Sequence, residues 1–168
     1  MTRRTFVPLA CALLACAPRQ PAPAASPASD AATTPETSAV TLERTPCFGS
    51  CPVYTVSIAR SGTVRFTGRH HTAQTGEATA EIPPARVDSL IAELERAGYF
   101  EMADAYVMDS PACGMYATDS PTVITSATLR GKTKTIRHDR GCFAAPPALS
   151  RLEQRIDEVA GSRRWVGR

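Results

Sequence analysis

The sequence predicts an α+β domain in which an antiparallel sheet of about five or six strands carries two main helices packed on one face. Two β-hairpin patterns support this, because each consists of alternating apolar and polar residues on both sides of a turn glycine. A helical pattern follows each hairpin, opens on Pro-Pro-Ala and closes at a glycine. Each helix has one apolar stripe, which needs a sheet face to cover.

The strands are expected where apolar and polar residues alternate. This alternation predicts strands over 40–44, 53–59, 63–66, 75–82, 122–129 and 133–138. Turns at Gly62 and Gly131 join four of these segments into two hairpins, and strands joined by tight turns pair antiparallel.

The helices are predicted over 84–97 and 147–160. Apolar residues recur in them at helical spacing, at Val87, Leu90, Ile91 and Leu94 in the first and at Leu149, Leu152, Ile156 and Val159 in the second. The spacing from Pro-Pro-Ala to glycine is the same in both, with an offset of 63 residues. This offset raises the hypothesis of a duplicated hairpin-helix unit, although the two turn glycines are 69 residues apart.

The amino terminus is typical of an exported lipoprotein. Residues 1–15 have a basic start at Arg3 and Arg4 and a short apolar run, which together form the plan of a signal peptide. The segment Leu-Leu-Ala-Cys that ends at Cys16 resembles the bacterial lipobox, whose cysteine is lipidated and becomes the first mature residue. Ala17 in place of aspartate implies sorting to the outer membrane. The two arginines also resemble a twin-arginine export motif, so the export route stays open.

Residues 16–39 follow as a lipidated cysteine and a tether. This segment is rich in proline, alanine, serine and threonine, and it has too few large apolar side chains to bury, so we expect it to be disordered. Residues 40–168 then form a single domain. Without the signal peptide the chain has 17 basic and 16 acidic residues. This balance argues against a nucleic-acid partner.

Four cysteines remain after lipidation: Cys47, Cys51, Cys113 and Cys142. An even number of cysteines in an exported domain indicates two disulfides, for which three pairings exist. We favour Cys47 with Cys51, because Gly49 lets the chain turn sharply between them, and therefore Cys113 with Cys142.

A thiol-redox or metal-binding enzyme using Cys47 and Cys51 is the alternative interpretation. Reactive cysteine pairs usually lie at the amino end of a helix, whereas a strand follows Cys51. His70, His71 and His138 lack metal-ligand spacing and are interpreted as surface residues. We therefore assign no catalytic residue, metal or cofactor.

The segment Thr-Pro-Cys-Phe-Gly-Ser-Cys-Pro-Val-Tyr over 45–54 carries a family resemblance. Together with Ala-Gly-Tyr-Phe over 97–100 and Thr-Asp-Ser-Pro-Thr over 118–122, it resembles the bacterial domain-of-unknown-function family 6438. The resemblance spans about 40–166 and implies an exported or lipid-anchored protein. It implies no activity, and Cys113 and Cys142 are additions to the family pattern.

These observations predict a lipid-anchored protein of the bacterial envelope, on the outer membrane and facing the periplasm. We expect a non-catalytic binding or interaction module, whose partner is an envelope protein or a glycan. Aromatic residues between the first helix and the second hairpin form a candidate binding groove: Tyr99, Phe100, Tyr106 and Tyr116. Aromatic residues near a helix end more often belong to a hydrophobic core, which is the alternative interpretation.

Overall fold

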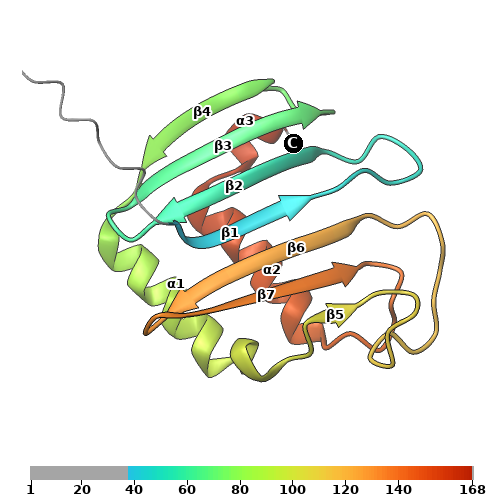
Figure 1. The fold of residues 1–168 in the computed structure, drawn as a ribbon. Coiled ribbons are helices and arrows are strands. Elements are labelled where there is room, and N and C mark those ends of the chain that lie inside the picture. The colour runs from blue at the N-terminus through green and yellow to red at the C-terminus, as the bar shows by residue number, and fades with distance from the viewer. Residues whose placement is uncertain (1–37, 168) are drawn as a thin grey trace, which may run out of the picture. The chain divides into compact units, whose positions relative to one another are not determined.

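The computed structural model describes residues 38–167, which Figure 1 shows as a ribbon. In chain order the elements are β1 (Ser38–Arg44), β2 (Val53–Ala59), β3 (Thr63–His70), β4 (Gly76–Glu81), α1 (Pro84–Arg96), the 3-10 turn η1 (Tyr99–Glu101), β5 (Ala105–Tyr106), β6 (Thr122–Leu129), β7 (Lys132–Asp139), α2 (Pro147–Ala160) and α3 (Arg163–Val166). The predicted signal peptide, Cys16 and the tether up to residue 37 lie outside the described residues. Residues 38 and 39, which the sequence assigned to the tether, belong to β1.

Seven strands form one sheet in the order β4-β3-β2-β1-β6-β7-β5. β1 lies at its centre and pairs antiparallel with β2 on one side and with β6 on the other. The pairing continues antiparallel outward through β3 and β4 and through β7. The short β5 pairs parallel with β7 at one edge, so the sheet is mixed at that edge.

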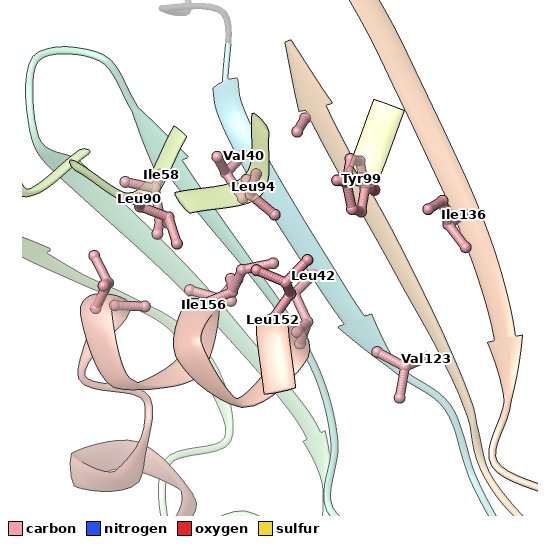
Figure 2. Packing of buried hydrophobic residues seen from close by; sticks show 14 of the residues in the cluster. Val40, Leu42, Ile58, Leu90, Leu94, Tyr99, Val123, Ile136, Leu152 and Ile156 are labelled. Atoms are coloured by element: carbon pink, nitrogen blue, oxygen red, sulfur yellow. The ribbon is translucent and has the colours of Figure 1, made fainter. Parts of the chain in front are cut away.

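Both long helices cover the same face of this sheet (Figure 1). In β1, Val40 and Leu42 are fully buried beneath them, and Thr41 and Glu43 point to the uncovered face. Figure 2 shows the core between the two layers, formed by Val40, Leu42, Ile58, Leu90, Leu94, Leu152 and Ile156 among others. Full burial of one such side chain contributes about 1.5–3 kcal/mol, so this layer supplies most of the stabilisation.

The predicted α+β class and the two helices are confirmed. Both helices have proline in their first turn, where the missing N–H costs no intrahelical hydrogen bond. The chain leaves α2 through Gly161 in the left-handed conformation (φ 68°). The sheet has one strand more than expected, because β5 is two residues long and too short for alternation to reveal. Within 38–167 no helix is long and apolar enough to cross a membrane.

The hairpin-helix segments are not copies of one another in three dimensions. β2 and β6 are both antiparallel to β1 and therefore run in the same direction. However, β3 and β7 lie on opposite sides of their respective partners, each away from β1. Because both helices cover the same face, the two segments have opposite handedness and no rotation superposes them. The hypothesis of a duplicated unit was wrong, and the matching Pro-Pro-Ala and glycine signals reflect similar helix ends.

Gly62 closes the β2–β3 hairpin in a conformation that other residues rarely adopt (φ 102°), and a Cβ there would overlap the carbonyl oxygen of Ile82. Gly131 closes the β6–β7 hairpin at φ 77°, with nothing within 4 Å of the added atom. We expect Gly131→Ala to lower the free energy of unfolding by about 1–2 kcal/mol, the cost of the backbone conformation alone. Gly62→Ala should cost at least about 1 kcal/mol more, because β4 must also move. Urea denaturation of both variants measures this difference, and equal losses would contradict it.

Candidate functional site

Three connections lie together at one end of the sheet: 45–52 between β1 and β2, 107–121 between β5 and β6, and 140–146 between β7 and α2. We call these three segments the loop end, which is on the right in Figure 1. The antiparallel register places them together, because Arg44, the last residue of β1, pairs with Val123 near the start of β6.

Backbone hydrogen bonds join the three segments of the loop end. The N–H of Phe48 donates to the carbonyl of Asp119 (3.2 Å), which links the first segment to the second. The N–H of Phe143 donates to the carbonyl of Met115 (3.0 Å), which links the third segment to the second. A bridge between Tyr116 and Cys142 adds to this pairing. The loop end is therefore one hydrogen-bonded unit.

Two disulfides brace this unit. Cys47 is bonded to Cys51 within the first segment, and Cys113 is bonded to Cys142 between the second and third. These are the pairs that the sequence favoured. Cys113 and Cys142 are buried, whereas Cys47 and Cys51 are half-buried. The first disulfide closes a small ring on the surface, and the second fastens the long segment 107–121 to the end of the sheet.

Large apolar side chains are exposed on the loop end. Phe48 is 89% exposed, Met115 76%, Phe143 66% and Met108 59%, and these four are the exposed large hydrophobic residues of the described chain. Met115 and Phe143 are neighbours through their backbone hydrogen bond, and Phe48 lies inside the small disulfide ring. Sequence analysis did not identify this surface, because loop position alone does not reveal which apolar side chains fail to reach a core.

A hydrogen-bonded triad fixes β1 and β2 to α2 beside the loop end. Arg44 donates to Asp157 Oδ2 (2.7 Å) and to the hydroxyl of Tyr54 (2.9 Å). The hydroxyl of Tyr54 donates in turn to Asp157 Oδ1 (2.8 Å). Burial first, and then the negative charge of Asp157, raise the pKa of Tyr54, so its hydroxyl stays protonated at neutral pH.

A second polar cluster lies beneath the third segment. His138 Nδ1 lies 2.6 Å from Glu153 Oε1, and Arg140 donates to Glu153 Oε2 (3.0 Å). Glu153 is fully buried and His138 is 3% exposed, so the interpretation of His138 as a surface residue was wrong. Its position two residues after the buried Ile136 on β7 is the signal that places it on the inward face.

The four residues of the candidate groove do not line one surface. Tyr99 and Tyr106 are buried in the core, where the hydroxyl of Tyr99 lies 2.8 Å from Thr125 Oγ1. Burial raises the pKa of Tyr99 to about 12. Tyr116 is half-buried in the loop end and donates to Asp139 Oδ2 (3.0 Å), a hydrogen bond that raises its pKa. Phe100 borders a surface depression, together with Leu129, Lys132 and Lys134.

The polar groups of these two clusters bond chiefly to one another. Among residues 38–167 no three histidine, cysteine or acidic side chains gather in a way that could hold a metal ion. His138 and Glu153 lie within hydrogen-bonding distance of one another under α2, and Asp157 has both oxygens engaged. The apolar side chains of Phe48, Met108, Met115 and Phe143 remain exposed on the loop end.

The sequence model of DUF6438, a domain of unknown function, matches residues 38–160, which is most of the chain. The protein belongs to this family. The match begins at the first residue of β1 and ends at the last residue of α2, so it spans the sheet and both long helices. No curated protein matches the chain.

The two disulfides should differ in their contribution to stability. In the chain-entropy description, the five-residue ring of Cys47 and Cys51 is worth about 2 kcal/mol and the longer loop of Cys113 and Cys142 about 3–4 kcal/mol. We expect the double substitution Cys47→Ser with Cys51→Ser to lower the melting temperature moderately, and Cys113→Ser with Cys142→Ser to lower it more. Calorimetry under non-reducing conditions measures both, and non-reducing peptide mapping checks the pairing. A larger loss for the first pair, or a peptide that links Cys47 to Cys113, would contradict the expectation.

Glu153 holds two cationic or hydrogen-bonding partners in a buried position, so its removal should be costly. Glu153→Ala leaves His138 buried without its partner, and we expect a loss of about 3–5 kcal/mol. Glu158→Ala on the same helix is the matched control, because Glu158 is exposed and its ion pair with Arg155 should contribute about 0.5 kcal/mol or less. Chemical denaturation compares the two, and similar losses would show that the buried cluster is not a brace.

Proposed function

We propose that this protein is a lipid-anchored, non-catalytic interaction module of the bacterial envelope whose loop end contacts a protein partner. The observation that carries the proposal is the concentration of exposed Phe48, Met108, Met115 and Phe143 on one end of the sheet. Large exposed apolar surfaces on folded domains mark interaction sites, and aromatic residues and methionine are enriched in protein interfaces.

The bracing of the loop end supports this function. A binding surface that is already ordered loses less conformational entropy when a partner docks. The ring of Cys47 and Cys51 restricts the segment that presents Phe48, and backbone hydrogen bonds restrict Met115 and Phe143. Burial of one such side chain in a partner's pocket would contribute about 1.5–3 kcal/mol, which is the size of an interface anchor.

The loop end lies at the opposite end of β1 from the start of the described chain, and it carries two carboxylates. The described chain begins at Ser38, and the loop end follows Arg44 at the other end of the same strand. Seven residues of strand extend about 20 Å. The loop end therefore lies across the sheet from the point at which the proposed tether joins the domain. Asp109 and Asp119 within it disfavour insertion into a bilayer, which favours a partner other than the anchoring membrane.

An envelope location agrees with the disulfides. Disulfide-bonded domains are typical of oxidising compartments outside the cytoplasm. Lipidation of Cys16 and sorting to the outer membrane, facing the periplasm, are the finer part of the proposal and rest on the amino-terminal sequence. Cys16→Ala should release the full-length protein from the membrane fraction, and unchanged retention would contradict lipid anchoring.

Site-specific photo-crosslinking in the native bacterium tests the interaction surface. A photoreactive residue at position 48 of the full-length protein should give a discrete adduct with another protein after irradiation. The control is the same residue at position 135, because Thr135 is exposed on the open face of the sheet, away from the loop end. Identical adducts at both positions, or adducts with lipid or glycan alone at position 48, would refute a protein partner at the loop end.

A further inference from the structure

The two edges of the sheet differ in how they are protected. At one edge β7 is followed by the two-residue β5, and the irregular segment 107–121 continues from it. At the other edge β4 is six residues long and has no neighbour beyond it in the strand order. Figure 1 shows this strand along the top of the sheet with no other described element beside its outer side. β4 is therefore the long free edge of the described domain.

The register identifies which backbone groups β4 leaves free. The N–H of Ile82 donates to the carbonyl of Gly62, and this pair continues the register that joins Glu81 to Thr63. In an antiparallel ladder, residues that bond to the partner strand alternate with residues that do not. The backbone groups of Glu77, Thr79 and Glu81 consequently point away from β3, toward the free edge. These three residues offer N–H donors and C=O acceptors for an added strand.

Proline, lysine and a β-bulge, three features that often protect an edge strand, are absent from β4. Its sequence, Gly-Glu-Ala-Thr-Ala-Glu, contains no proline or lysine, and its pairing with β3 continues without a register shift. Register shifts do occur in the β1–β2 and β2–β3 pairs further inside the sheet. The charged side chains of β4 are those of Glu77 and Glu81, which are exposed and both negative.

We propose that β4 binds an extended basic peptide segment of another protein by strand addition, at a surface separate from the loop end. Added strands gain affinity from main-chain hydrogen bonds and specificity from alternate side chains. Peptide residues opposite Glu77 and Glu81 lie on the same face as these carboxylates. At this cross-strand spacing, opposite charges attract, so lysine or arginine is favoured there. The peptide thus has basic residues four positions apart.

The neighbours of the edge define the remaining peptide positions. Arg65 on β3 is opposite Thr79. A basic residue at the central peptide position, on the other side of Thr79, would be repelled by Arg65. We therefore expect a neutral residue at this position. On the other face, the half-buried Ala78 and Ala80 border the hydrophobic core. Small apolar peptide residues there would extend this layer. The pattern is basic, apolar, neutral, apolar, basic, as in Lys-Val-Thr-Val-Lys.

The same charges argue against a second copy of the protein as the occupant. Antiparallel pairing of two β4 strands about Thr79 would place Glu77 of one chain opposite Glu81 of the other. Two such like-charge contacts would oppose this self-pairing. The carboxylates therefore disfavour this self-pairing and are complementary to a basic strand.

Titration of the full-length protein with acetylated and amidated Lys-Val-Thr-Val-Lys tests the proposal, with amide NMR as the readout at low ionic strength. We expect saturable shifts of the amides of Glu77, Thr79 and Glu81 below about 1 mM peptide. The peptide Glu-Val-Thr-Val-Glu should bind at least about tenfold more weakly, because two attractive contacts become repulsive. A backbone N-methylated form of the basic peptide should not bind, since it cannot pair with the edge.

Two variants separate strand addition from non-specific attraction. Thr79→Pro removes an N–H that points to the free edge and keeps the ladder with β3, so it should abolish binding without unfolding the domain. Glu77→Lys with Glu81→Lys should reverse the preference toward the acidic peptide. Glu101→Lys with Glu158→Lys, two exposed positions outside the loop end and β4 with the same change in net charge, is the matched control and should bind like the native protein. No saturable shift, equal affinity for both peptides, shifts away from β4, or dimerisation that Thr79→Pro prevents would each overturn the proposal.

Discussion

Burial of β1 is the constraint on which the rest of the structure depends. Val40 and Leu42 are fully buried, and β1 is the strand that joins the β2–β3–β4 half of the sheet to the β6–β7–β5 half. Since one face of this strand must be covered along its whole length, α1 and α2 both pack on that face. The ion pair of Glu93 on α1 with Arg155 on α2 joins the two helices above it. Loss of β1 would separate the β2–β3–β4 half of the sheet from the β6–β7–β5 half.

The single helical layer leaves the other sheet face to water, and the register arranges polar side chains across it. One row consists of Thr79, Arg65, Ser57, Thr41, Ser126 and Thr135, each opposite the next. This is the usual solution for an antiparallel sheet with one solvated face. With the helices on one face and hydroxyl groups on the other, the surfaces left for apolar or strand-like contacts are the loop end and the β4 edge.

The loop end combines strong bracing with an unfavourable exposure of apolar side chains. Two disulfides, the triad of Arg44, Tyr54 and Asp157, and the buried cluster around Glu153 all stabilise the base of these segments. Phe48 nevertheless remains 89% exposed at the tip. Folding alone gains nothing from this arrangement, because an exposed phenylalanine contributes no burial. In the proposed function this surface becomes buried in a complex. The bracing then lowers the conformational entropy that is lost when the partner docks.

The sequence by itself determined the local structure of this protein. Pro-Pro-Ala and glycine specified both helix ends, glycines at 62 and 131 specified the hairpin turns, and the spacing of Cys47 and Cys51 favoured their pairing, because each depends on the geometry of a few adjacent residues. Only the tertiary structure decided the strand order, the opposite handedness of the two hairpins and the existence of β5. It likewise decided that His138 is buried against Glu153 and that Phe48 is not buried. These features depend on which segments far apart in the sequence pack together. Hydrophobic periodicity predicts which side chains of a strand face the core, but it does not predict which strand lies beside it.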